Sequence, residues 1–209
     1  MKLIGVTGGI ASGKTLVTDY LTALGAPVVD ADVISHKVTE PGSPVLKEIA
    51  AAFGEGYLDE NGELKRQKLG DLIFQREEYR LKLNAILHPK IGSSIQEELR
   101  RCEEAGEAVV IFSAPLMVEG GRNSMTDEIW VVALNPGEQI RRLMARDGID
   151  EEAANARLQS QSSLEEKLAI ADRIIDNNGS VEETKSQVKA LWEEINGEVN
   201  EQPTKQTKT

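Results

Sequence analysis

The stretch GGIASGKT, at residues 8–15, combines three glycines, a lysine and a hydroxyl side chain in one short run. Its spacing, Gly8-x-x-x-x-Gly13-Lys14-Thr15, fits the pattern of a phosphate-binding loop. In such a loop backbone N–H groups surround the phosphates, the lysine reaches the β- and γ-phosphates, and the hydroxyl binds Mg²⁺. The sequence therefore predicts a site for the phosphates of a nucleotide, formed around Lys14 and Thr15.

The segments on either side of this loop follow the order that the motif requires. The apolar run LIGV at 3–6 predicts a buried strand. After the loop, apolar residues recur at helical spacing as far as Gly25, which is typical of a helix end. A helix that begins at the loop directs its free N–H groups and the positive end of its dipole at a bound anion. An ordinary tight turn is the alternative, and the order of strand, loop and helix favours the phosphate site.

Two carboxylates come at the end of the next predicted strand, at residues 26–32. Asp30 and Asp32 are two positions apart, so they share a face if the strand continues and need not if the chain turns after Asp30. A carboxylate beside a nucleotide site can orient an acceptor hydroxyl or take its proton. Aspartate is also a good N-cap for a helix, and the sequence leaves open which of the two has which role.

Basic side chains gather in the helical segment 137–171, although the protein is acidic overall: Arg141, Arg142, Arg146, Arg157 and Lys167. Charge runs are usually solvated helix faces with ion pairs between neighbouring turns. Beside a nucleotide site, the same residues could instead belong to a mobile lid that holds phosphates. Composition alone leaves both interpretations open.

Composition limits the classes of function. The 209 residues are 40% apolar and 28% charged, which is normal for a globular protein. The net charge of −11 argues against non-specific nucleic-acid binding, which needs a basic surface. The sole cysteine, Cys102, excludes an intrachain disulfide. The apolar runs are far too short to span a membrane and the N-terminus does not resemble a cleavable signal, so we expect a cytoplasmic protein with no membrane partner.

The remaining chain predicts the elements that must position these residues. Runs typical of buried strands occur at 3–6, 26–32, 108–115, 128–134 and 172–177. Because helical stretches separate them, the sequence predicts an α/β fold with a parallel five-stranded sheet flanked by helices. Ligands of such sheets bind at the carboxyl ends of the strands, where the phosphate loop and both aspartates fall. Residues 33–89 contain several helical stretches and no clear strand, which indicates an inserted helical region.

Among proteins with a phosphate loop, the sequence favours a small-molecule kinase. It has no Asn-Lys-x-Asp motif of the kind that a GTPase switch uses for guanine, and no basic track for a nucleic-acid motor. A kinase benefits from an acceptor pocket, a basic closing segment and a carboxylate near the acceptor hydroxyl. The helical region, the arginines and the two aspartates meet these needs. A nucleoside or nucleotide kinase, and a regulatory protein that only binds ATP, remain as alternatives.

Longer motifs go beyond residue type. They read TGGIASGKT, VVDADVISHKVTEPGSPV, LNAILHPKI, APLMVEGG, QIRRLMARDGIDEEAANARLQSQSSLEEKLAIAD and IIDNNGS. In this order, over residues 2–197, they resemble the dephospho-coenzyme A kinase family. The resemblance implies a P-loop NTPase core of the nucleoside-monophosphate-kinase type at 1–32, 90–136 and 172–197. It also implies a helical acceptor-binding insertion at 33–89 and a helical lid at 137–171. Residues 198–209 lie beyond the resemblance, and their polar composition without periodicity predicts a disordered tail.

The activity implied by the resemblance is the last step of coenzyme A synthesis. The family transfers the γ-phosphoryl group of ATP, with Mg²⁺, to the ribose 3′-hydroxyl of dephospho-coenzyme A. The expected partner is therefore this small-molecule substrate, with no nucleic acid, and the expected assembly is a monomer or a small homo-oligomer. A closing lid suits the reaction because it keeps water from competing as the acceptor.

The resemblance also implies roles for individual residues. The ATP phosphates would contact Ala11, Ser12, Gly13, Lys14, Thr15 and Leu16. Thr15 would hold Mg²⁺, Asp32 would orient or deprotonate the 3′-hydroxyl, and the lid arginines Arg142 and Arg146 would approach the nucleotide. The acceptor would lie near His88, Pro89, Pro115, Leu116 and Glu119. The adenine would lie near Asn177 and Gly179.

Two positions depart from the family pattern. Ser113 stands where the family commonly has an aspartate that looks like a Walker-B ligand of Mg²⁺, so support for the metal would come through water, Asp32 or Glu119. His36 stands where the family often has arginine, so either an acceptor contact or a surface position is expected there. His88 precedes a proline and is compatible with an acceptor contact or with a helix-end cap, and a structural role is favoured.

Overall fold

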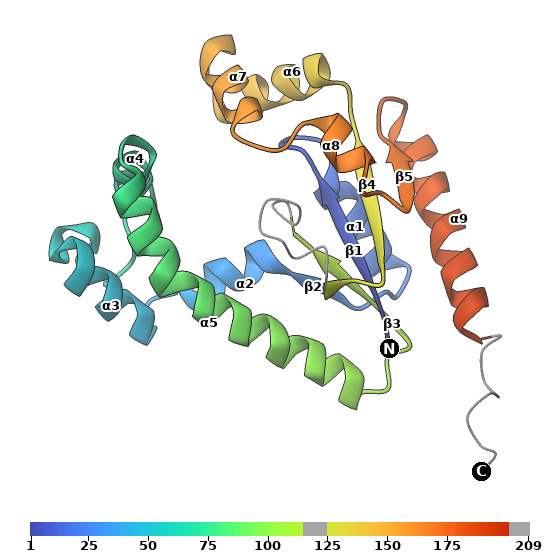
Figure 1. The fold of residues 1–209 in the computed structure, drawn as a ribbon, viewed down its shortest axis with the longest axis horizontal. Helices are drawn as coiled ribbons and strands as arrows, with labels where there is room; N and C mark the ends of the chain where they lie inside the picture. Colours follow the sequence, from blue (N-terminus) through green and yellow to red (C-terminus); the bar gives the residue numbers. More distant parts are fainter. Residues whose placement is uncertain (115–124, 201–209) are drawn as a thin grey trace. The chain divides into compact units, whose positions relative to one another are not determined.

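The computed structural model describes residues 1–114 and 125–200, within two compact units (Figure 1). One unit comprises Met1–Val29 and Cys102–Thr209, and the other comprises Asp30–Arg101. The phosphate loop and the arginine-rich segment belong to the first unit, and both aspartates belong to the second.

The first unit alternates strands with helices. Its elements are β1 (Lys2–Gly8), α1 (Lys14–Ala23), β2 (Val28–Asp30), β3 (Val109–Ser113), β4 (Glu128–Ala133), α6 (Pro136–Asp147), α7 (Glu151–Gln159), α8 (Leu164–Leu168), β5 (Arg173–Asp176) and α9 (Val181–Asn200). β1 pairs in parallel with β3, where Ile4 lies opposite Ile111, and with β4, where Val6 lies opposite Trp130. The five-stranded sheet has the order β2-β3-β1-β4-β5. This topology confirms the predicted α/β fold with a parallel sheet flanked by helices.

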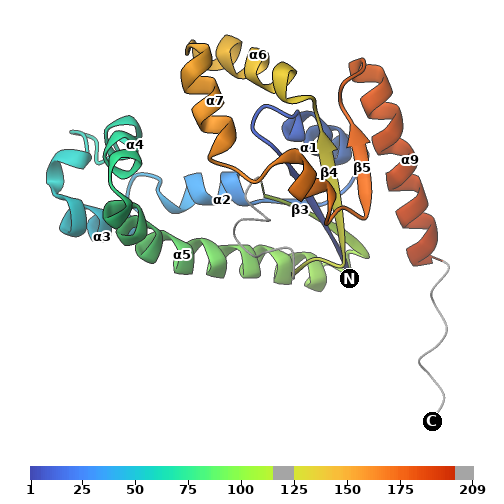
Figure 2. The same ribbon diagram turned by 45° about the horizontal axis from the view of Figure 1, so that its top comes forward.

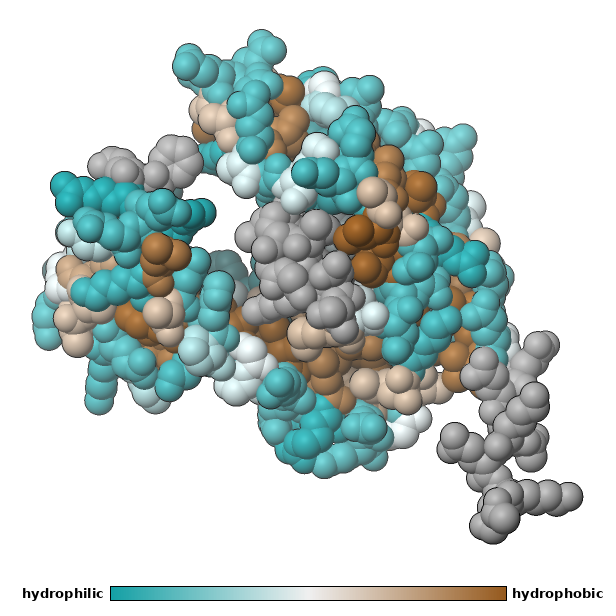
Figure 3. Space-filling view, in the orientation of Figure 1, coloured by the Kyte–Doolittle hydropathy of each residue, from teal (hydrophilic) through white to brown (hydrophobic). Residues whose placement is uncertain are grey.

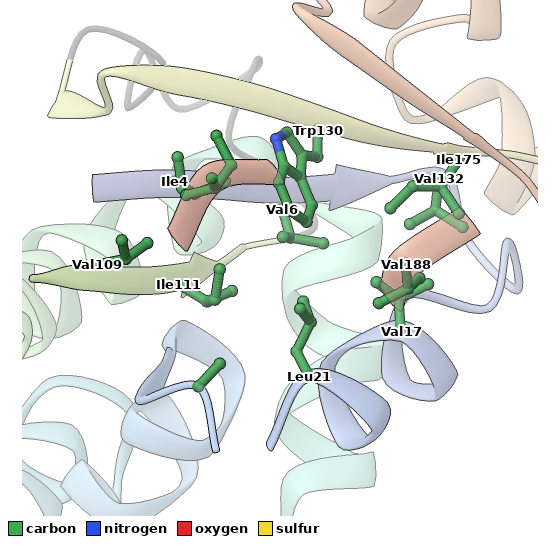
Figure 4. Close-up of a cluster of buried hydrophobic side chains, with 12 residues drawn as sticks. Ile4, Val6, Val17, Leu21, Val109, Ile111, Trp130, Val132, Ile175 and Val188 are labelled. Carbon is green, nitrogen blue, oxygen red and sulfur yellow. The ribbon is translucent and has the colours of Figure 1, made fainter. Parts of the chain in front are cut away.

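One face of the sheet is covered by α1 and α9, which lie side by side (Figures 1 and 2). Alternate strand residues such as Val6 and Trp130 point to this face and meet Val17 of α1 and Val188 of α9 (Figure 4). All four of these side chains are fully buried. Because a strand alternates its side chains between faces, this packing fixes the position of α1 relative to β1. It thereby fixes both ends of the loop that joins them.

The second unit is helical. Its elements are α2 (Ala31–Val38), α3 (Pro44–Phe53), the 3₁₀ turn η1 (Glu55–Tyr57), α4 (Arg66–Gln75) and α5 (Glu77–Glu104), whose last residues reach the first unit. The described part of this unit holds one isolated bridge, Leu58 with Leu64, and no strand. It has a core of its own, formed by Val45, Leu46, Ile49, Leu69 and Leu83. The role of this helical region as an acceptor-binding insertion stays a prediction.

The longest helix, α5, runs across a predicted boundary. The predicted end of the acceptor region is residue 89, whereas α5 continues through Pro89 to Glu104 and the compact unit continues to Arg101. A proline inside a helix removes one backbone hydrogen bond and costs roughly 3 kcal/mol. The helix therefore continues at a position where a local reading of the sequence favours a break.

The surface on the side shown in Figure 3 is mostly hydrophilic, with hydrophobic side chains in scattered patches. This agrees with the high content of charged residues, 28%. Within residues 1–114 and 125–200, no helix combines the length and the apolar character that crossing a membrane requires.

Candidate functional site

The phosphate loop joins β1 to α1 and is packed too tightly for side chains at its glycines. A Cβ atom on Gly8 would contact the Oγ of Ser12 and would lie 2.9 Å from the Val132 carbonyl oxygen. A Cβ atom on Gly9 would lie 2.5 Å from the Nε2 of Gln139. Gly13 has a φ of 97°, in the left-handed region that favours glycine. The glycines are therefore required by the fold of the loop itself.

The start of α1 suits a bound anion. Gly13 is the N-cap, no side chain caps the helix, and the first turn carries no acidic residue. The first N–H groups of a helix have no partner within the helix, and they attract anions. Thr15 is exposed in this turn, as a hydroxyl that meets a ligand must be.

Ser12 adds a second sign that the loop is built around something polar. Its side chain is buried, and the Oγ atom has no hydrogen-bond partner among the described residues. Buried polar atoms are nearly always hydrogen-bonded. Together with the glycine cradle, this atom shows that the residues present fit the phosphates of a nucleotide.

The lysine of the loop contacts the end of β3. Lys14 Nζ donates a hydrogen bond to Ser113 Oγ over 2.5 Å, and Ser113 is fully buried. Ser113, the position at which the pattern described above has an aspartate, thus lies next to the lysine. The hydroxyl found here offers an oxygen without a negative charge.

Three side-chain amides hold the backbone of the loop. Gln139 of α6 donates to the carbonyl oxygen of Ile10 over 2.7 Å, and Gln161, between α7 and α8, accepts from the Ile10 N–H over 2.8 Å. Asn177, after β5, donates to the carbonyl oxygen of Ser12 over 2.6 Å. The first two residues were not identified as site residues from the sequence. A glutamine at a buried helix position is the signal that could have pointed to Gln139.

Asn177 has both halves of its amide engaged. Its Nδ2 group binds the loop, and its Oδ1 atom accepts from the Thr184 hydroxyl over 2.8 Å. Asn177 and Thr184 are both buried. Gly179 lies beside the carboxylate of Glu183, an exposed side chain that would have to move to admit a Cβ atom there. The predicted role of Asn177 and Gly179 at the adenine stays a prediction.

Two neighbouring arginines of α6 lie in different surroundings. Arg141 and Arg142 both bind Glu138, over 2.7 Å and 2.9 Å. Hydrogen bonds from Arg141 and, as the next largest cause, from Arg142 lower the pKa of Glu138 to about 2. An Nη atom of Arg142 also lies 3.8 Å from the position of a Cβ atom on Gly13, whereas the side chain of Arg141 is 71% exposed. The structure thus brings Arg142 to the phosphate loop and leaves Arg141 on the surface.

The other basic residues of this segment have protein partners. Arg146 and Arg157 both bind Asp147, and the hydrogen bonds that Arg146 donates to the Asp147 carboxylate raise the pKa of Arg146. Lys167 is fully buried and donates to the carbonyl oxygen of Ser162 over 2.8 Å. Ion pairs therefore account for part of the charge in 137–171, as a solvated and ion-paired surface would require. Only the two pairs with Glu138 join neighbouring turns of one helix, whereas Asp147 pairs with its chain neighbour Arg146 and with Arg157 of α7.

The two aspartates have separate positions at the start of α2. Asp30 Oδ1 accepts from the N–H groups of Asp32 and Val33, over 2.8 Å and 3.1 Å, so Asp30 is the N-cap. The predicted strand at 26–32 ends at Asp30, where the chain turns into the helix. Asp32 lies exposed in the first helical turn.

The remaining predicted acceptor contacts differ in what the structure says of them. His88 and Pro89 are exposed on α5. Because the helix continues past them, the prediction that His88 caps a helix end is wrong. Pro115, Leu116 and Glu119 lie outside the described residues.

Comparison with known proteins gives a consistent result. The sequence profile of the dephospho-CoA kinase family matches residues 2–183. A dephospho-CoA kinase of Bacillus cereus is 43% identical over 194 residues, which cover 93% of this chain and 97% of the relative.

Two solved structures are also similar. A dephospho-CoA kinase from Campylobacter jejuni has a TM-score of 0.72 and 30% identity, covering 95% of this chain and 99% of its own. A crystal structure of a Thermus thermophilus protein has a TM-score of 0.80 and 33% identity, covering 93% of this chain and 97% of its own. The phosphate loop, the arginine beside it and these matches over nearly the whole sequence agree, and the chain belongs to the dephospho-CoA kinase family.

Proposed function

We propose that this chain transfers the γ-phosphoryl group of ATP to the ribose 3′-hydroxyl of dephospho-CoA, which gives CoA and ADP. The observation that carries the proposal is the family match over residues 2–183, which include the phosphate loop and α6. The geometry of the first unit supports it, because phosphoryl transfer depends on alignment and charge neutralisation rather than on covalent help from the protein.

The proposed phosphate contacts come from the loop and from α6. N–H groups in the run from Ala11 to Leu16 bind the phosphate oxygens, except that of Ser12, which donates to the Gly9 carbonyl oxygen over 3.0 Å. Lys14 exchanges its bond to Ser113 for the β- and γ-phosphates. Arg142, three residues beyond Gln139, adds a second positive charge at the same loop. Mg²⁺, which the Thr15 hydroxyl would hold together with phosphate oxygens, would neutralise further charge. Arg146 as a nucleotide contact stays a prediction, because its partner here is Asp147.

The proposed acceptor contact is Asp32. With Asp30 engaged as the helix cap, Asp32 is the carboxylate proposed to orient the 3′-hydroxyl or take its proton. The first turn of α2 holds this carboxylate on a regular helix, which restricts its motion. His88, Pro115, Leu116 and Glu119 remain predicted acceptor contacts.

The test measures both products in one reaction. The protein is incubated with Mg·ATP, with and without dephospho-CoA, while ADP is followed enzymatically and CoA by mass. We expect ADP to form only with the acceptor and in equal amount to CoA. Lys14→Ala is the control, and its turnover should fall about 1,000-fold, the scale of losing one preorganised charge contact to the transition state. ADP without CoA would contradict the proposed acceptor.

The two alternatives predict other outcomes of the same assay. A nucleoside or nucleotide kinase would prefer an acceptor without a pantetheine arm when several are offered at equal concentration. A regulatory protein would bind ATP tightly and show no acceptor-dependent ADP release. A monomeric or small homo-oligomeric state and a cytoplasmic location stay predictions.

A further inference from the structure

Two side chains of the segment 137–171, one before and one after α7, bind the same residue of the phosphate loop. Gln139, in the first turns of α6, donates to the Ile10 carbonyl oxygen over 2.7 Å. Gln161, after α7, accepts from the Ile10 N–H over 2.8 Å. One residue of the loop thus has both its backbone groups bonded to the arginine-rich segment.

The two bonds restrict the loop in a way that one bond cannot. Ile10 is held on both its donor and its acceptor side, as a residue in a β-sheet is held by its neighbour. The peptide groups on either side of Ile10 are therefore held in one orientation. The next residues have their orientation set from this point. Ser12 donates its N–H to the Gly9 carbonyl oxygen over 3.0 Å, and the N–H groups of Ala11 and Gly13 are the ones that face a phosphate in the proposed site.

Gln139 is built into the loop rather than laid over it. The residue is 4% exposed, and its Nε2 atom occupies the space that a Cβ atom on Gly9 would need. Gly9 is therefore required for the approach of this amide. Because Gly9 leaves space for this one side chain, the contact with Gln139 is part of how the loop folds.

The same bond also places an arginine. Residues three apart on a helix share a face, so Gln139 and Arg142 both turn towards the loop. While Gln139 holds α6 at Ile10, an Nη atom of Arg142 lies 3.8 Å from the Cβ position of Gly13. Loss of the Gln139 bond would therefore remove one contact that places this arginine relative to the loop.

We propose that Gln139 and Gln161 are positioning residues, which hold the Ile10 peptides so that the loop N–H groups and Arg142 meet the ATP phosphates together. The proposal rests on the proposed phosphoryl transfer. It assigns no chemical step to either glutamine. It predicts that each acts through one half of its amide: the NH₂ group of Gln139 and the carbonyl oxygen of Gln161.

Because the two glutamines use different halves of the amide, substitution by glutamate should have different effects at positions 139 and 161. Glutamate has the shape of glutamine but cannot donate, so Gln139→Glu loses its bond to the Ile10 carbonyl oxygen. Gln161→Glu keeps an acceptor for the Ile10 N–H, and Gln161→Met removes it. Gln159→Glu, at an exposed position two residues away, makes the same change in charge without touching the loop.

The first readout is steady-state kinetics. We expect kcat to fall about 100-fold in Gln139→Glu and in Gln161→Met, the scale of a misplaced reacting group. Gln161→Glu should recover kcat to within about tenfold of the unaltered protein, since the bond is retained. The KM for dephospho-CoA should stay the same throughout, because the acceptor does not contact the loop amides. Equal losses in Gln139→Glu and Gln161→Glu would overturn the proposal, since charge alone would then explain both.

The second readout does not depend on activity. Hydrogen exchange of the Ile10 amide, followed by NMR, should be fast in Gln161→Met and slow in Gln161→Glu, with both proteins folded by circular dichroism. An Ile10 amide that stays protected in Gln161→Met would overturn the proposal. If the unaltered protein phosphorylates no acceptor, the proposed function fails separately. Calorimetric binding of Mg·ATP then decides, because equal affinities in all variants would contradict positioning and weaker binding in Gln139→Glu and Gln161→Met would support it.

Discussion

Lys14 Nζ donates a hydrogen bond to Ser113 Oγ over 2.5 Å, which joins the first residue of α1 to the last residue of β3. β1 and β3 are neighbours in the sheet. The bond connects them, because Lys14 begins the helix that follows β1 and Ser113 ends β3. A hydroxyl binds an ammonium group less strongly than a carboxylate does, because a bond between two charged groups is roughly twice as strong. Lys14 can therefore exchange this partner for phosphate oxygens more easily than it could leave an aspartate.

The neutral side chain at 113 predicts a change in the Mg²⁺ requirement. Ser113→Asp adds a carboxylate oxygen, the ligand type that Mg²⁺ prefers, and should lower the Mg²⁺ concentration for half-maximal activity by roughly tenfold. The measurement is a Mg²⁺ titration of CoA formation at saturating ATP. Ser113→Asn has nearly the same shape without the charge. An equal shift in both variants would show that size, and not charge, is responsible.

Substitutions of the two aspartates at the start of α2 should have different effects, with Asp32 needed for turnover and Asp30 for stability. Asp32→Asn should lower kcat by about 100-fold or more, because the amide cannot take a proton from the acceptor. Asp30→Asn should keep near-normal kcat, since asparagine caps a helix as well as aspartate does. Asp30→Ala should lower the free energy of unfolding by about 1 kcal/mol. Kinetics and urea unfolding measure these effects, and a kcat in Asp32→Asn that matches the unaltered protein would remove Asp32 from the proposed role.

Arg142 and Arg141 are adjacent and share Glu138, so they form a matched pair. Arg142→Gln should lower kcat by about 100- to 1,000-fold, because it removes a positive charge that stabilises the transferred phosphoryl group in the transition state. Arg141→Gln should change kcat by no more than about twofold, as is usual for an exposed side chain. The comparison needs only CoA formation at saturating substrates. Similar losses in the two variants would indicate that the ion pairs with Glu138 matter, rather than contact with ATP.

Glu128, at the start of β4, predicts how stability depends on pH. Burial acts to raise the pKa of Glu128, but hydrogen bonds from Trp130, Lys2 and Arg173 outweigh it, and the pKa lies below its ordinary value. A carboxyl with a lowered pKa stabilises the folded state above the pKa of the unfolded chain, about 4.3, and this contribution is lost as the pH falls through the folded pKa.

The free energy of unfolding should therefore fall as the pH is lowered from about 5 to 3, and it should fall less steeply in Glu128→Gln. Urea unfolding at each pH measures both slopes. Parallel curves for the two proteins would show that the pKa of Glu128 is not lowered by folding. CoA formation by Glu128→Gln at neutral pH serves as the control for a folded protein.

Local sequence patterns determined much of this protein. The glycine spacing at 8–15, the apolar run before it and the helical spacing after it identified the phosphate loop, and all five predicted strands are present. These features depend on neighbours along the chain, so periodicity and turn chemistry suffice to predict them. The boundary at residue 89 lacked such support, because packing along α5 outweighs the local effect of Pro89.

The tertiary structure decided what each polar residue does. Gln139 and Gln161 lie 129 and 151 positions from Ile10 in the sequence, and only the packing of α6 and the segment after α7 against the loop brings them to one residue. Arg141 and Arg142 are alike in sequence terms, and the rotation of α6 decides which of them reaches Gly13. The sequence by itself determined which residues could carry the chemistry. Their partners follow from burial of apolar faces, which places side chains together that no local pattern relates.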